Sequence, residues 1–116
     1  DGPMPCVCIN HGGGPMPLLG QQPSIAAFLS GYAATLPRRP RAVLVATAHW
    51  EEPEVTVSTG ANPSLLFDYS GFPQESYAYS YPAPGEPNVA AEALRLLREA
   101  GIAAKEDPRR GWDHGV

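Results

Sequence analysis

The sequence predicts an α/β domain whose central sheet is largely parallel and flanked by helices. Residues 42–48 are almost wholly apolar, as in a strand buried on both faces of a parallel sheet. Two other segments, at 24–36 and 88–100, repeat apolar residues with the spacing of an α-helix. Shorter strand-like segments precede and follow these helices, and the resulting order of elements is typical of α/β folds.

The first half of the chain is expected to supply a strand, a helix and a second strand. Residues 5–10 form a short apolar run that stops at three glycines, which indicates a buried strand leading into a loop. The helix at 24–36 is bracketed by prolines. The strand at 42–48 ends at His49 and two glutamates.

The second half is expected to supply a strand, a long loop, a helix and a weak strand. Residues 54–58 alternate valines with polar side chains. Residues 59–87 are rich in Tyr and Pro, which predicts an ordered, functional loop packed on the domain. The helix at 88–100 precedes Gly101 and a weak strand at 102–106. Its predicted buried face consists of Val89, Ala93, Leu96, Leu97 and Ala100.

Composition indicates a small globular domain and excludes several classes of protein. The 116 residues are 43% hydrophobic and carry a net charge of −4, so we expect one domain over residues 1–116. The acidic balance argues against a nucleic-acid partner, and no run approaches the roughly 20 apolar residues of a membrane span. Cys6 and Cys8 make no disulfide framework, which favours a reducing, cytoplasmic setting. We expect both thiols in the core, with metal binding as the alternative.

Three histidines, His11, His49 and His114, are the best candidates for chemistry. Each lies beside glycine or at the end of a predicted strand, and parallel sheets bind ligands at the carboxyl ends of their strands. They could therefore converge on a metal site, with ordinary loop histidines as the alternative. Gly12–Gly14 can adopt positive φ and let a substrate or metal approach the backbone around Gly13. A phosphate cradle or an esterase oxyanion hole fits this run less well, because the accompanying motifs are absent.

Further candidates are polar and aromatic. Asp113 precedes His114 and could orient its imidazole, or cap a turn as an ordinary aspartate. The loop between Tyr69 and Tyr81 offers a wall for an aromatic ring. We therefore place Gly13, Asp113 and Tyr81 on the substrate side of the site.

Five short motifs occur in an order that resembles a known enzyme family. They are Asn10–Pro15, Thr47–Glu51, Asp68–Pro73, Tyr81–Gly85 and Gly111–Gly115. The ordered set resembles the amino-terminal half of the class III extradiol ring-cleavage dioxygenases, and most closely the 4,5-DOPA extradiol dioxygenase group. The resemblance covers essentially the whole chain.

This resemblance implies a non-haem metal site that cleaves a catecholic ring with O₂. His11 and His49 match the family's two metal-binding histidines, and His114 matches a catalytic histidine that contacts substrate or oxygen. The implied cofactor is Fe(II), with Zn(II) as the alternative, since histidine ligands suit both. The expected partners are a small catechol and O₂, with neither nucleic acid nor membrane.

The family takes its third metal ligand and its acid/base histidine from the carboxy-terminal half, for which this chain has no matching residues. The chain starts at Asp1 and stops at Val116, and its last residues, 112–116, read like the start of an element rather than its end. We therefore expect a truncated domain, the amino-terminal part of a single catalytic domain. It would have an open sheet edge, exposed apolar faces, and little metal affinity or activity on its own.

Two other functions are compatible with these residues. A binding module similar to the Memo-like proteins would use the same fold, although the Phe72-Pro73 and Tyr81–Gly85 motifs favour the DOPA group. A zinc-dependent hydrolase would instead use all three histidines as ligands, with water in the fourth position.

Overall fold

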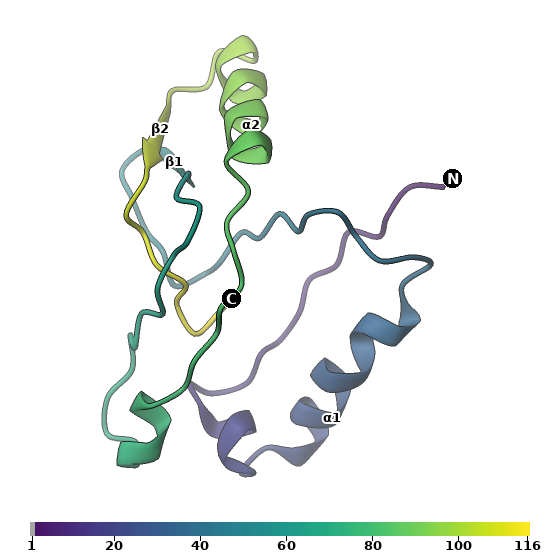
Figure 1. Ribbon diagram of the computed structural model, residues 1–116, viewed down its shortest axis with the longest axis vertical. Coiled ribbons are helices and arrows are strands. Elements are labelled where there is room, and N and C mark those ends of the chain that lie inside the picture. The colour runs from purple at the N-terminus through teal and green to yellow at the C-terminus, as the bar shows by residue number, and fades with distance from the viewer. Residues whose placement is uncertain (1) are drawn as a thin grey trace. The chain divides into compact units, whose positions relative to one another are not determined.

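The computed structural model describes residues 2–116, which form two compact units (Figure 1). One unit takes in the described residues up to Val43 together with Tyr69–Tyr79. The other consists of Leu44–Asp68 and Ser80–Val116. Each unit is therefore built from two separate stretches of the chain.

The first unit holds the helix expected at 24–36. Its α-helix, α1, runs over Pro23–Tyr32 and continues as the 3-10 helix η2 over Ala33–Thr35. A further 3-10 helix, η1, covers Met16–Leu19. Proline in the first turn suits α1, because its fixed φ is helical and its missing N–H has no partner there. The expected helix is confirmed, with its last turn tightened to 3-10 geometry.

The Tyr/Pro-rich loop contributes its middle part to the same unit. The 3-10 helix η3, Gln74–Tyr77, contains Ser76, whose side chain is fully buried. The Tyr69 hydroxyl donates to the Ser76 carbonyl, and the Tyr69 ring meets the Phe72 ring edge-on with centroids 5.5 Å apart. These contacts show the ordered aromatic packing that the composition of the loop predicts.

The second unit is a β–α–β arrangement with a parallel pair of strands. Strand β1, Val55–Ser58, pairs in parallel with β2, Ala104–Asp107, in the register Val55↔Ala104. Helix α2, Pro87–Glu99, connects them and packs beside both strands (Figure 1). The α/β class is confirmed, and both strands lie within two residues of their expected positions.

Helix α2 ends where expected, and its buried side matches the expected face only in part. Gly101 has φ +78° and donates its N–H to the Arg98 carbonyl, which closes the last turn. The buried residues are Ala90 and Leu94, whereas Leu96, expected inside, is 53% exposed. Ala93 and Leu97 of the predicted face are partly buried, whereas Val89 is 40% exposed. A narrow two-stranded sheet is expected to cover only a stripe centred on Ala90 and Leu94, so the predicted face was too wide.

Two expected strands are absent from residues 2–116. Segments 5–10 and 42–48 join no sheet, and Leu44 is 80% exposed. Cys6 and Cys8, expected in the core, are exposed as well. An apolar run gains strand pairing and burial only from neighbours, and the described sheet has only two strands. Apolar character alone therefore could not decide these assignments.

None of the helices within residues 2–116 is both long enough and apolar enough to cross a membrane.

The buried face of α2 can be tested with two substitutions in the same helix. Leu94→Ala should lower the free energy of unfolding by about 2–5 kcal/mol, because truncating a side chain that is only 4% exposed leaves a cavity in the packed interior. Leu96→Ala, the matched control, should change it by less than about 0.5 kcal/mol. Urea unfolding followed by circular dichroism measures both, and equal losses would contradict the assigned face.

Candidate functional site

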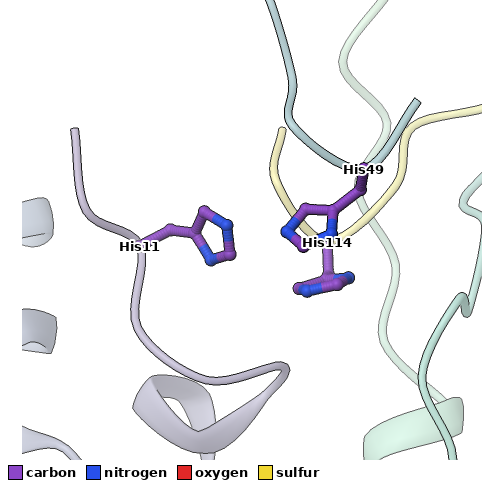
Figure 2. A group of neighbouring side chains, drawn as sticks. All are labelled: His11, His49 and His114. Atoms are coloured by element: carbon purple, nitrogen blue, oxygen red, sulfur yellow. The ribbon is translucent and has the colours of Figure 1, made fainter. Parts of the chain in front are cut away.

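Two of the predicted site residues, His49 and His114, lie together in the second unit. Their ring centroids are 3.8 Å apart and the rings are tilted by 37° (Figure 2). His49 follows the extended segment 42–48 and is exposed, whereas the His114 side chain is 14% exposed. The fold thus brings together two histidines that are far apart in the chain.

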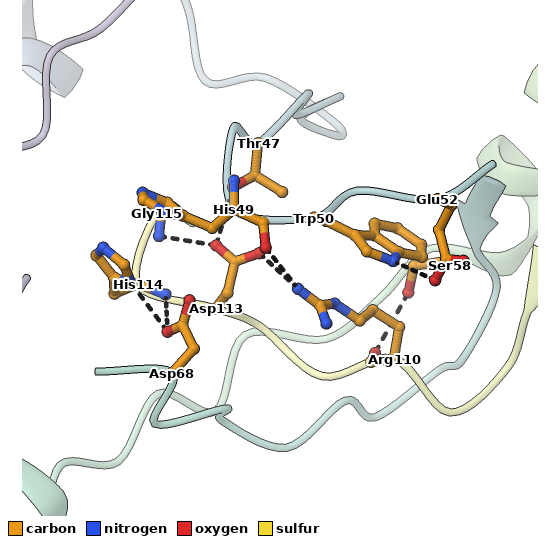
Figure 3. A network of polar contacts seen from close by, with 10 residues as sticks. All are labelled: Thr47, His49, Trp50, Glu52, Ser58, Asp68, Arg110, Asp113, His114 and Gly115. Atoms are coloured by element: carbon orange, nitrogen blue, oxygen red, sulfur yellow. Dashed lines mark hydrogen bonds and ion pairs between the residues drawn. The ribbon is translucent and has the colours of Figure 1, made fainter. Parts of the chain in front are cut away.

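The carboxylate of Asp68 holds His114. One oxygen, Oδ1, accepts the backbone N–H of His114 at 3.0 Å and lies 2.9 Å from the ring Nδ1 (Figure 3). Burial raises the pKa of Asp68, but the hydrogen bonds from the His114 side chain and backbone outweigh it. The pKa therefore lies below the ordinary value of 3.8, and the ionised carboxylate is favoured.

A second carboxylate, Asp113, holds the two histidine-bearing turns to each other. Asp113 is 3% exposed. Its Oδ1 accepts the Thr47 hydroxyl at 2.9 Å and the Gly115 N–H at 2.8 Å, and its Oδ2 accepts from Arg110 at 3.0 Å (Figure 3). Because Thr47 precedes His49 by two residues, a single buried group fixes the backbone on either side of the pair.

Arg110 completes this network from the other side. Its Nη2 donates to the His49 carbonyl at 3.4 Å, and its guanidinium lies 5.0 Å from the centre of the Trp50 ring. Trp50 in turn donates its indole N–H to Glu52 at 3.0 Å. The turn that carries His49 is therefore held at its carbonyl as well as through Thr47.

The turn that carries His114 requires glycine at position 115. A Cβ at this position would lie 2.9 Å from Cδ2 of His49 and 3.0 Å from the Asp113 carboxylate. Any larger residue would push the two turns apart. The glycine after His114 is thus a packing requirement of the histidine pair.

His11 and the glycine run belong to the first unit. Gly12 and Gly14 have φ of +82° and +47°, as expected for glycines that let the chain turn sharply. The N–H of Gly13 donates to the Gln22 side chain at 2.9 Å, and the Phe72 ring lies 3.1 Å from where a Cβ of Gly14 would be. The turn after His11 is therefore fixed by contacts within its own unit.

Two predicted site residues remain, Tyr81 and Asp113, and two residues of the site were not predicted. Tyr81 belongs to the second unit and is 48% exposed. The carboxylate bonded to the His114 ring is Asp68, whereas Asp113 bonds to turn backbone, a hydroxyl and Arg110. Sequence reasoning did not single out Asp68 or Arg110 for these roles. The signal available was their position, at the start of one family motif and directly before another.

Comparison with known proteins identifies the family of this chain. Residues 5–116 match the family described as the catalytic LigB subunit of aromatic ring-opening dioxygenase. The chain belongs to this family. The resemblance that the five motifs carry is thereby confirmed, and LigB relatives with dioxygenase names cover most of the chain.

Three LigB relatives show how much of such proteins the chain spans. It is 44% identical over 122 residues to the dioxygenase tasH of Hapsidospora irregularis, covering 97% of this chain and 37% of that protein. It is 33% identical over 109 residues to the 4,5-DOPA dioxygenase extradiol of Mirabilis jalapa (93% and 40%). With the protein of that name from Escherichia coli (strain K12), identity is 34% over 112 residues (97% and 40%). The chain thus spans about two-fifths of the length of these relatives.

The pKa of Asp68 fixes how it should affect stability. Because the folded state holds this pKa below 3.8, its stabilising effect is present above that value and is lost as pH falls through the folded pKa. Asp68→Asn should therefore be less stable than wild type near neutral pH, and the two should converge in acid. Urea unfolding across the pH range measures the difference.

Glu106→Gln is the control, since it removes an exposed carboxylate of β2. It should follow the wild-type pH profile. A stability gap for Asp68→Asn that stays constant from neutral pH into acid would contradict the role given to Asp68.

Proposed function

We propose that this LigB chain serves a metal-dependent extradiol dioxygenase that opens a catecholic ring with O₂. The observation that carries the proposal is the family match over residues 5–116, joined to a histidine pair backed by a carboxylate. His11 and His49 would be metal ligands, and His114 would be the catalytic histidine facing the substrate. The relatives named as 4,5-DOPA dioxygenases support a catechol as the substrate class.

The donor set fits the proposed metal. Each histidine offers one ring nitrogen, and imidazole suits both Fe(II) and Zn(II). The ring of His49 is exposed, while its backbone is fixed by Arg110 and through Thr47. A bound ferrous ion would supply the chemistry that histidines cannot, by acidifying the catechol hydroxyls and passing electrons to O₂.

The chain's own residues would bind and orient the substrate. The exposed ring of Tyr81 would form one wall for the aromatic ring of the catechol, and the backbone at Gly13 would permit close approach. Asp113 would act on the substrate side through the turns it holds, because its carboxylate is buried against Thr47, Arg110 and Gly115. His114 would meet a substrate hydroxyl.

On its own, the chain would be the amino-terminal part of one catalytic domain. Two histidine ligands leave most positions of a six-coordinate metal without protein, and the relatives are more than twice as long. We therefore expect weak metal binding and no turnover from these 116 residues alone. The proposed setting is the cytoplasm, with a small catechol and O₂ as partners.

One observation favours a zinc hydrolase as the second candidate. A carboxylate bonded to one ring nitrogen of a histidine is the usual support for a metal ligand, and Asp68 supports His114 in this way. In that case His114 would be a third ligand beside His11 and His49. The two candidates differ in whether His114 is needed to bind the metal.

The complete protein that carries this sequence provides the test. Loaded with Fe(II) without oxygen and then given catechols and air, it should form a yellow ring-opened product. His49→Ala should lower metal affinity and turnover by about 100-fold or more. His114→Ala should keep the metal, measured by elemental analysis, and lose turnover.

Glu106→Gln is the matched control and should retain both metal and turnover, because it lies on the exposed surface of β2. Absence of product from every catechol would contradict the dioxygenase. Loss of metal from His114→Ala, as complete as from His49→Ala, would favour the hydrolase.

A further inference from the structure

The segment Tyr81–Gly85, here called the proline loop, is stiff by composition. The φ angles of Pro82 and Pro84 are fixed by the pyrrolidine ring, and each proline restricts the residue before it to extended conformations. No helix or strand forms over residues 81–85. Because the proline loop has little conformational freedom of its own, a few contacts suffice to place it.

Two hydrogen bonds hold the proline loop, one at a carbonyl and one at an N–H. The indole N–H of Trp112 donates to the Ala83 carbonyl at 2.9 Å. The N–H of Gly85 donates to the Ala61 carbonyl, also at 2.9 Å. A Cβ at Gly85 would overlap the carbonyl oxygen of Gly60, so the two backbones approach without room for a side chain.

Trp112 is itself fixed through its backbone. Its N–H donates to the Ser64 carbonyl at 2.8 Å, and its carbonyl accepts the N–H of Leu66 at 2.7 Å, which makes a parallel bridge between the two segments. Two residues after Trp112 comes His114, and two residues after Leu66 comes Asp68, which holds the His114 ring. Trp112 therefore has its side chain on the proline loop and its backbone in the segment that carries His114.

We propose that Trp112 is a positioning residue for the substrate, because its indole N–H sets where the Tyr81 ring stands relative to the turn that carries His114. The effect on substrate rests on the proposed function, in which Tyr81 forms a wall for the catechol. The coupling of the proline loop to this turn does not, because it consists of contacts within the second unit.

This role differs from the roles of the two aspartates. Asp113 and Asp68 hold the histidine-bearing turns and the His114 ring, and neither contact involves the indole N–H of Trp112. Loss of the indole donor frees the proline loop at Ala83, the anchor nearer in sequence to Tyr81. The expected result is weaker binding of the substrate ring with the reacting groups still in place, so KM rises while kcat changes little.

Hydrogen exchange of the chain, followed by ¹H–¹⁵N NMR, tests the coupling without substrate. The indole N–H of Trp112 should exchange more slowly than that of Trp50, whose hydrogen bond is exposed. Trp112→Phe keeps an aromatic ring but removes the donor. The Gly85 N–H should then exchange about 3–10-fold faster, the effect of one neutral hydrogen bond, while the amides of α2 keep their protection. Glu106→Gln should match wild type.

Equal exchange of the two wild-type indoles would overturn the coupling, and so would unchanged protection of Gly85 in Trp112→Phe. The comparison of the indoles needs no variant, so it decides the anchor even if Trp112→Phe does not fold.

Kinetics of the complete protein, with L-DOPA as the probe, test the effect on substrate. Trp112→Phe should raise KM by about 3–10-fold and keep kcat within about twofold. In a Tyr81→Ala background the same substitution should change KM no further, because it acts through that ring. An equal rise in both backgrounds, as a merely structural role would give, or a fall in kcat with KM unchanged would contradict the positioning role.

The two experiments separate this inference from the proposed function. Protection of Gly85 that depends on Trp112, in a protein that cleaves no catechol, would uphold the coupling and overturn only the substrate assignment. Protection that does not depend on Trp112 would overturn the inference even if the complete protein cleaves catechols.

Discussion

The buried carboxylate of Asp113 is the interaction on which the histidine pair depends. It binds Thr47, Arg110 and Gly115 at once, and these groups come from chain segments that carry His49 and His114. Burying such a charge is costly unless it is fully hydrogen-bonded, and Asp113 meets that condition with a hydroxyl, a guanidinium and a backbone N–H. The contact of the two imidazoles is therefore a consequence of satisfying one carboxylate.

The two acidic residues divide the work of the site. Asp113 fixes where the turns lie, and Asp68 fixes how the His114 ring is turned by contacting both its Nδ1 and its backbone N–H. Rotation of the ring and displacement of the turn are separate errors, so each needs its own constraint. This division explains why two aspartates lie close to one histidine pair, one in contact with a ring nitrogen and the other with the turns.

The sequence allowed prediction of those features that local chemistry decides. The alternation of valines predicted β1. The proline at the start of α2 and the glycine after its end predicted that helix. Positive φ was foreseeable at Gly12 and Gly14 because only glycine takes it readily. The strands predicted at 5–10 and 42–48 are absent because strand formation depends on pairing with neighbouring segments. The partners of His114 and His49 were not predicted for the same reason. Asp68 and Arg110 are brought to these histidines only by the folding of the chain.

The central claim is that Asp113 holds His49 against His114, and ring-to-ring nuclear Overhauser contacts measure this most directly. In the wild-type chain the ring protons should show such contacts, because the centroids lie 3.8 Å apart. Asp113→Ala should abolish them while α2 and the β1–β2 pair remain folded, and Glu106→Ala should leave them unchanged. Contacts of undiminished strength in Asp113→Ala would contradict the account.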